Sequence, residues 1–339
     1  MITFTNKGIY CAAADVYIDP WKPVKKAILT HAHSDHARPG SQSYLAHHDS
    51  ASILRYRLGE ITLETTGYNE PVFMNGVRVS LHPAGHVQGS AQVRLEYQGE
   101  TWVISGDYKV QHDGLNVPFE PVPCQHFVTE STFGLPIYNF PPAAYVKNEL
   151  NTWVNNNALL GYNSVVIGYA LGKAQRVLSA LETGLPVLLH SAVYNTNEAL
   201  GFSNTRYIRF TDQFTKNLLD PGIVVAPASA MGSPWLRRFE PYRLAVCSGW
   251  MQLRGTRRRS NADKGIAMSD HADWTGLNEA VQATGAENVY VTHGYKSQYA
   301  AWLRENYGLN AVEVETEYEG DALVSGVSRT GNENTEEQP

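Results

Sequence analysis

The sequence has little of what secreted and membrane proteins require. It contains three cysteines in 339 residues, and no two of them form a Cys-x-x-Cys pair. This scarcity excludes a disulfide framework and a thiolate zinc site, since both need several closely spaced cysteines. The chain also lacks an apolar run long enough to cross a bilayer and an N-terminal basic-plus-apolar signal. We therefore expect a cytoplasmic protein without a membrane association.

An excess of positive charge is missing as well. The formal net charge of −6 argues against a nucleic-acid partner, because phosphate backbones favour basic surfaces. The charge is unevenly distributed, however, and the stretch from Arg237 to Lys264 contains eight basic residues against Glu240 and Asp263. Such a stretch is commonly a solvated face. Beside a cleft it would instead guide a polyanion.

Histidine and aspartate, in contrast, are concentrated in one short segment. The sequence His31-Ala-His-Ser-Asp-His36 directly follows the apolar run at residues 26–30. Imidazole and carboxylate are ligands for zinc and similar cations, and four of them this close can be shared between two adjacent ions. The segment therefore predicts a metal loop, with a polar, solvated turn as the alternative.

Further histidines and aspartates follow β-rich runs. His86 comes after the alternating stretch 77–81, Asp107 after 101–106 and His293 after 287–292, each beside glycine or proline. This pattern places them in loops at strand ends, where functional residues gather around a rigid sheet. Asp19 follows a shorter apolar stretch, where a simple turn residue is an equally good interpretation.

The complete pattern resembles the metallo-β-lactamase superfamily, in which an HxHxDH loop is followed by a His, an Asp and a His. The resemblance implies that His31, His33 and His86 hold one divalent metal ion, that Asp35, His36 and His293 hold a second, and that Asp107 bridges both. It also implies an α/β fold of the αββα sandwich type. Asp19 would brace the metal loop.

The segment between Asp107 and His293 is too long for a connection within one sheet. Candidate strands at 164–170, 186–190, 222–226 and 243–247 alternate with helical patterns at 173–181 and 195–200. This alternation predicts a parallel sheet covered by helices. We expect an inserted α/β domain at 135–262, a first domain made of 1–134 and 263–327, and a disordered tail at 328–339.

The insertion makes the chain resemble the β-CASP nuclease branch of that superfamily. Residues 129–134 (Thr-Glu-Ser-Thr-Phe-Gly) resemble the acidic motif of the branch, residues 170–175 its Gly-basic-x-Gln turn, and residues 269–273 (Ser-Asp-His-Ala-Asp) its second histidine motif. The resemblance implies that His271 is the general acid and that Glu130 holds its tautomer. A seventh metal ligand or a helix-capping neighbour remains the alternative for His271, and a structural acid for Glu130.

Other residues are candidates for substrate contact. Hydroxyl pairs and helix N-termini bind anions, so Ser131, Thr132 and Lys173 are expected to grip a terminal phosphate. They could equally be two turn formers and an exposed charge. Arg254 and Arg257 are expected to contact the backbone of an incoming strand.

The compact length and the segments at 8–12 and 248–252 resemble the bacterial ligase-associated DNA exonucleases. This resemblance implies a cytoplasmic repair enzyme that digests DNA, single-stranded or with a free 5′ end, from 5′ to 3′. It also implies a functional link to an ATP-dependent DNA ligase and a helicase. Two ions, Zn²⁺ or Mn²⁺, would lower the pKa of water so that hydroxide attacks phosphorus, and Asp35 would orient this hydroxide as well as bind metal.

Three other functions stay open at this stage. An RNA nuclease with the same mechanism would carry the same ligands. A hydrolase of small esters or lactams would lack the inserted segment and the counterparts of Glu130 and His271. A non-catalytic scaffold would have lost metal ligands, whereas all seven are present in the sequence.

Overall fold

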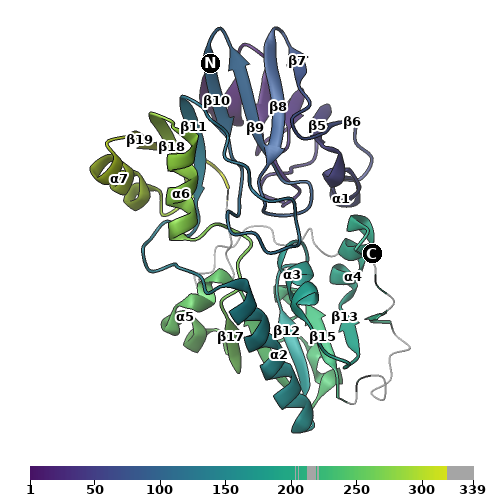
Figure 1. Cartoon of the computed structure of the whole chain (residues 1–339). Coiled ribbons are helices and arrows are strands. Elements are labelled where there is room, and N and C mark those ends of the chain that lie inside the picture. Colours follow the sequence, from purple (N-terminus) through teal and green to yellow (C-terminus); the bar gives the residue numbers. More distant parts are fainter. Residues whose placement is uncertain (203, 205, 212–218, 220, 319–339) are drawn as a thin grey trace.

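A computed structural model describes residues 1–202, 204, 206–211, 219 and 221–318 of the chain. It shows a mixed α/β protein in which three β-sheets are flanked by helices (Figure 1). Two sheets occupy the upper part of the view, and the third lies below them with α2 and α3 in front of it. The predicted tail at 328–339 lies outside the described residues.

The first sheet contains six strands in sequence order, β1 to β6. The strands from β1 to β3 pair antiparallel, whereas those from β3 to β6 pair parallel. A one-turn 3₁₀ helix and helix α1 connect the last two strands. The elements are β1 (Ile2–Thr5), β2 (Gly8–Cys11), β3 (Val16–Ile18), β4 (Lys26–Ile28), β5 (Ser43–His47), η1 (His48–Ser50), α1 (Ala51–Leu58) and β6 (Leu63–Thr66).

The second sheet contains seven strands in the order β19-β18-β11-β10-β9-β8-β7. Strands β10 and β11 near its centre pair in parallel. A parallel pair needs a long connection, and more than twenty residues link these two strands. Its elements are β7 (Val72–Met74), β8 (Val77–Pro83), β9 (Ala91–Tyr97), β10 (Glu100–Ile104), β11 (His126–Ser131), α6 (Trp274–Thr284), β18 (Asn288–Gly294), α7 (Lys296–Tyr307) and β19 (Asn310–Glu313).

The first two sheets face each other across a shared core. One cluster of buried side chains joins Ile9, Ile18 and Ile28 of the first sheet to Val79 and Val93 of the second. The outer face of the first sheet packs on α1, and the outer face of the second packs on α6 and α7. The order of layers is therefore helix, sheet, sheet, helix.

Helix α6 begins and ends where its sequence contains capping residues. The Asp273 carboxylate accepts the backbone N–H of Gly276 at 2.8 Å, and Gly285 ends the helix in the left-handed region at φ +64°. Carboxylates at the first turn and glycines beyond the last turn satisfy the backbone groups that a helix leaves unpaired. His271 and the segment before it are thereby held at the start of α6.

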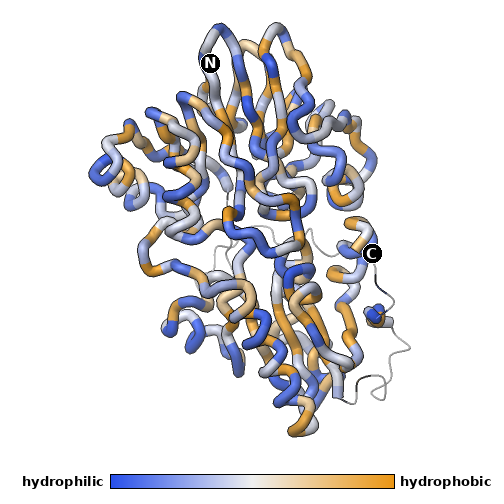
Figure 2. Tube along the Cα trace, in the orientation of Figure 1, coloured by the Kyte–Doolittle hydropathy of each residue, from blue (hydrophilic) through white to orange (hydrophobic). Residues whose placement is uncertain are grey.

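The third sheet is entirely parallel, in the order β14-β13-β15-β12-β16-β17. Its central strands are rich in valine and isoleucine because both faces are covered, by α2, α3 and α4 on one side and by 3₁₀ turns on the other. Figure 2 shows these strands as runs of hydrophobic residues. The elements are α2 (Ala143–Leu159), β12 (Asn163–Ile167), α3 (Lys173–Ala180), β13 (Val187–Leu189), α4 (Ser191–Leu200), β14 (Tyr207–Arg209), β15 (Ile223–Ala226), η3 (Ala228–Ala230), η4 (Pro234–Phe239), β16 (Tyr242–Cys247), η5 (Gly249–Gln252), α5 (Arg254–Arg259) and β17 (Lys264–Ile266).

The predicted parallel sheet and its alternating helices are confirmed. Strands β12, β13, β15 and β16 and helices α3 and α4 lie within a few residues of the expected ranges. The division into domains at 135 and 262 stays a prediction; strand β17, at 264–266, pairs with β16 in the third sheet. Within the described residues, no helix combines the length and the hydrophobicity that a membrane span needs.

Candidate metal centre

The predicted metal loop leaves the end of β4 and is braced from a neighbouring strand. Asp19, directly after β3, accepts the backbone N–H of Thr30 at 2.7 Å with one carboxylate oxygen. Its other oxygen contacts the Thr30 hydroxyl at 2.5 Å and His36 Nδ1 at 2.7 Å. One buried carboxylate therefore fixes both ends of the loop that carries His31, His33 and Asp35.

The remaining predicted ligands reach the same place from three strands of the second sheet. His86 follows β8 and Asp107 follows β10, both after the strand has ended, as the sequence predicts. His293 differs from the prediction, because it lies inside β18 as its second-last residue, at the irregularity between the Thr129–Val291 and Ser131–Gly294 pairs. The parallel pairing of β11 with β18 continues to Gly294, so the strand extends past the metal-facing histidine.

Asp107 lies between two groups of histidines, and each of its carboxylate oxygens faces one group. Its Oδ2 lies 3.5 Å from Nε2 of His31 and 3.9 Å from Nε2 of His86. Its Oδ1 lies 2.9 Å from Nε2 of His293 and 3.5 Å from Nε2 of His36. His33 joins the first group, with its Nδ1 3.0 Å from His86 Nε2. Asp35 approaches the second, with its carboxylate 3.8 Å from His36 Nε2.

The nitrogen atoms that point into this centre fit a divalent metal. Nε2 of His31, His36 and His293 and Oδ1 of Asp107 are buried and have no hydrogen-bond partner. The opposite ring nitrogens form hydrogen bonds with oxygen atoms. For example, His86 Nδ1 contacts the Asp270 carbonyl at 2.8 Å, and His31 Nδ1 contacts the Thr30 hydroxyl at 3.0 Å. Metal-binding histidines characteristically use one ring nitrogen for the ion and the other for an oxygen acceptor.

The protonation states of these groups also favour a cation. Burial lowers the pKa of His31 and of His86 well below its usual value, so both imidazoles are neutral, as metal ligands must be. Burial would raise the pKa of Asp107, but His36 and His293 hold it well below the usual range. For His36, burial would lower the pKa, whereas Asp107, Asp35 and Asp19 raise it to about 10. The buried carboxylates thus require positive charge at this place.

A histidine–glutamate pair stands beside the metal centre. The Nδ1 atom of His271 lies 2.9 and 3.1 Å from the two carboxylate oxygens of Glu130, which is completely buried. Glu130 also accepts the backbone N–H of Tyr108 at 2.8 Å. Burial would lower the pKa of His271, but Glu130 and then Asp107 raise it to about 10. The His271 ring lies 4.7 Å from that of His86, so it is adjacent to the predicted ligands.

The residues expected to grip a terminal phosphate are placed differently from the expectation. Lys173 is fully buried, and its ammonium pairs with the equally buried Asp270 at 2.9 Å. The Ser131 hydroxyl is buried too and contacts the backbone carbonyls of His293 at 2.7 Å and Thr292 at 3.2 Å. Because these groups serve internal contacts, they are not exposed for a strand end. Thr132 is also buried, 2% exposed.

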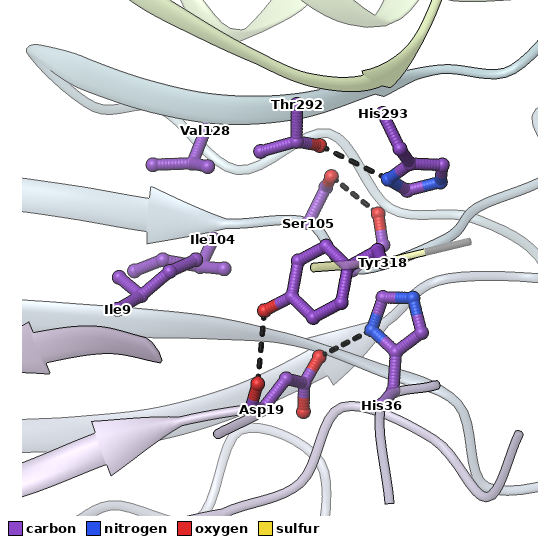
Figure 3. Close-up of a pocket in the computed structure, with 10 residues that line it drawn as sticks. Ile9, Asp19, His36, Ile104, Ser105, Val128, Thr292, His293 and Tyr318 are labelled. Carbon is purple, nitrogen blue, oxygen red and sulfur yellow. Dashed lines mark hydrogen bonds and ion pairs between the residues drawn. The ribbon is translucent and has the colours of Figure 1, made fainter. Parts of the chain in front are cut away.

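Sequence reasoning missed two residues that contact this centre. Asp270 pairs with Lys173, and its carbonyl holds His86; its position beside His271 in Ser-Asp-His-Ala-Asp was the available signal. Tyr318 stacks on His36 with ring centroids 4.3 Å apart, and its hydroxyl donates to the Asp19 carbonyl at 3.0 Å. Figure 3 shows its ring beside the His36 imidazole. No spacing rule in the sequence connects Tyr318 to a loop almost three hundred residues away.

Comparison with known proteins gives relatives with names of two kinds, a DNA ligase and RNA-cleaving factors. A protein of Opitutus terrae named "Probable DNA ligase" is 32% identical over 315 residues, which are 90% of this chain and 30% of that protein. The "Endoribonuclease ysh1" of Emericella nidulans is 31% identical over 123 residues, 35% of this chain and 14% of the relative. The "Cleavage and polyadenylation specificity factor subunit 3" of Dictyostelium discoideum is 28% identical over 139 residues, 39% of this chain and 17% of that one. These relatives are consistent with the resemblance of the chain to the β-CASP branch of the metallo-β-lactamase superfamily.

The chain spans less than a third of the length of these three relatives. No family model matches it. Among solved structures, a protein of unknown function from Enterococcus faecalis superimposes with a TM-score of 0.59 at 14% identity, covering 86% of this chain and 79% of that one. At this identity the likeness concerns the fold alone. The clustered His and Asp side chains of the chain are suited to bind divalent metal.

Proposed function

We propose that the chain is a dinuclear metal-dependent phosphodiesterase that digests DNA as an exonuclease in DNA repair, from 5′ to 3′ and with a preference for single strands. His31, His33, His86 and Asp107 would hold one ion, and Asp107, Asp35, His36 and His293 the other. Imidazole and carboxylate ligands suit Zn²⁺ and Mn²⁺ alike.

The observation that carries this proposal is the position of Asp107. Its two carboxylate oxygens face different groups of histidines, at 3.5 and 3.9 Å on one side and at 2.9 and 3.5 Å on the other. A carboxylate with one oxygen toward each of two ligand groups is the arrangement that a bridge between two ions needs. A single-ion site would leave one of these groups without a function.

The roles of the protein side chains follow from their contacts. Bound ions would lower the pKa of water and neutralise charge on the scissile phosphate. His271 donates a proton from Nε2 to the leaving oxygen, because Nδ1 is engaged by Glu130. Glu130 cannot rotate away, since it also holds the Tyr108 backbone. Asp19 keeps the His36 ring oriented through a 2.7 Å contact to Nδ1.

The choice of DNA rests on the relative that covers most of the chain. The relative named as a probable DNA ligase aligns with 90% of it, which supports a role next to a ligase in repair. The endoribonuclease relatives match a shorter part and support the second candidate, an RNA nuclease with the same mechanism. The link to a separate ligase and a helicase remains a prediction.

The layers support a finer assignment of the fold. We infer that the two facing sheets with their outer helices form the αββα sandwich of the superfamily, and that the third sheet belongs to the inserted β-CASP domain. Because β17 (264–266) pairs in that sheet, this assignment extends the insertion a few residues past the predicted boundary at 262. The shared core of the first two sheets, with α1 on one side and α6 and α7 on the other, supports this inference.

The test is a gel assay with metal-loaded protein and 5′- or 3′-labelled single-stranded DNA, with RNA of the same sequence as a second substrate. We expect DNA to be shortened progressively, and RNA to be cleaved more slowly. His271→Ala should retain bound metal but lose most turnover, whereas His48→Ala, on a histidine that is 58% exposed, should leave both unchanged. Degradation of RNA without cleavage of DNA would overturn the choice of substrate.

A further inference from the structure

Helix α5 carries an unusual concentration of positive charge. Four of its six residues are arginine, and Arg254, Arg257, Arg258 and Arg259 are all exposed. Within the described part of the chain, no carboxylate lies within ion-pair distance of any of the four. This is unexpected in a protein with a formal net charge of −6.

The helix does not need this charge for its own stability. Arg254 and Arg258 are four residues apart on one face, where like charges repel. Basic residues in the last turn interact favourably with the helix dipole, but Arg254 stands in the first turn, where positive charge is unfavourable. The helix is attached through Thr256, which is buried, and through Arg257 Nε, which donates to the Met251 carbonyl. The outward arginines therefore point to an anionic partner.

A series of packed aromatic rings lies between α5 and the candidate metal centre. Trp250, in the 3₁₀ turn just before α5, packs on Phe133 with ring centroids 4.9 Å apart and on Tyr138 at 5.5 Å. Phe133 in turn lies 6.1 Å from the His271 ring. The turn packs closely on Phe133, since a Cβ added at Gly249 would lie 2.3 Å from that ring. The position of α5 relative to His271 is thus fixed by packed rings.

We propose that α5 is a docking surface for the phosphate backbone of single-stranded DNA, with the arginines as the contacts that hold the strand while its end lies at the metal centre. This inference rests on the proposed function and deepens it. A six-residue helix is about 9 Å long, so it matches a few phosphates of one strand. Arginine pairs with phosphate through two parallel N–H groups, and aromatic rings beside such contacts accommodate unstacked bases.

The test measures binding separately from cleavage. Full-length, metal-loaded protein is titrated against a fluorescent phosphorothioate oligothymidylate that resists hydrolysis, and anisotropy is recorded at several salt concentrations. For R254Q/R258Q we expect at least tenfold weaker binding at 0.1 M salt. The plot of log K against log salt should become shallower, with a slope smaller in magnitude by about 1.4, because each lost phosphate contact to a single strand removes roughly 0.7. The matched control is K25Q/K26Q, which removes two exposed lysines at the start of β4, and the metal loop follows the other end of this strand. This variant should bind DNA as the wild type does.

A second assay shows that the metal centre is intact. Hydrolysis of bis(p-nitrophenyl) phosphate, which is too small to reach α5, should be unchanged in R254Q/R258Q. Unchanged DNA affinity and salt slope in that variant would overturn the proposal, as would an equal loss in both assays or equally tight binding of duplex DNA through α5. A wild-type protein that binds DNA through α5 but hydrolyses no diester would leave the docking surface in place and contradict the proposed function instead.

Discussion

Replacing Lys173 with methionine removes one charge from a buried ion pair and leaves most of the side-chain volume in place. The Lys173 ammonium and the Asp270 carboxylate are 2.9 Å apart, and their side chains are 0% and 1% exposed. Burial would raise the pKa of Asp270, but Lys173, His271 and His86 hold it well below the usual range. In K173M this carboxylate remains buried without its closest positive partner.

The expected loss in the free energy of unfolding follows from leaving the Asp270 carboxylate without this partner. Removing one member of a buried ion pair destabilises a protein by about 3–5 kcal/mol, because the remaining charge has lost its compensation. Arg176 also lowers the pKa of Asp270 and compensates a part of the charge, so we expect the lower end, about 3 kcal/mol. The loss should extend to metal binding, since the Asp270 carbonyl holds His86 Nδ1.

Urea unfolding followed by circular dichroism measures this effect, with zinc affinity as a second readout. The double variant K173M/D270N removes both charges and should recover most of the lost stability, as neutral replacements of buried pairs commonly do. The control is K147M, because Lys147 pairs with Glu182 at the surface and such pairs contribute at most about 1 kcal/mol. A K173M variant as stable as K147M, or a double variant no more stable than K173M, would refute the reasoning.

Two further predictions concern stability. Gly294→Ala should unfold at clearly lower urea concentration than Gly285→Ala, because both glycines have positive φ but only at Gly294 would the new Cβ meet backbone, the Ser131 carbonyl oxygen at 2.1 Å; equal losses would contradict the steric argument. Burial lowers the pKa of His47 to about 4, and its Nδ1 accepts the Asp49 N–H at 3.2 Å. In the unfolded chain the His47 imidazole binds a proton near pH 6.5. The free energy of unfolding should therefore fall as the pH is lowered from 6.5 to 4. His47→Asn keeps an acceptor without titrating and should flatten that part of the profile; an unchanged urea-midpoint profile would contradict this.

The sequence was sufficient for the parts of the site that follow local rules. His86 and Asp107 are predicted at strand ends, where the structure has them, because glycine, proline and alternating apolar residues mark where strands stop. The parallel third sheet was predictable for the same reason, since valine-rich strands alternate with helical periods. The predicted end of β18 is two residues too early, because pairing with β11 extends the strand beyond its own apolar run.

The burial of Lys173 could not be predicted in this way. A lysine at a helix start is expected to be exposed, and only the tertiary position of Asp270 makes its burial possible. The same holds for Tyr318, whose contact with His36 joins distant parts of the chain. Sequence patterns therefore located the side chains that point at the metal centre but not the residues that hold them in place.

Metal stoichiometry tests the central claim most directly. Protein saturated with zinc or manganese, freed of loosely bound ions and measured by inductively coupled plasma mass spectrometry, should contain two ions per chain. Asp107→Ala should lose both, because this carboxylate faces both groups of histidines. One ion in the wild type, or unaltered stoichiometry in the Asp107→Ala variant, would contradict the bridged two-metal centre.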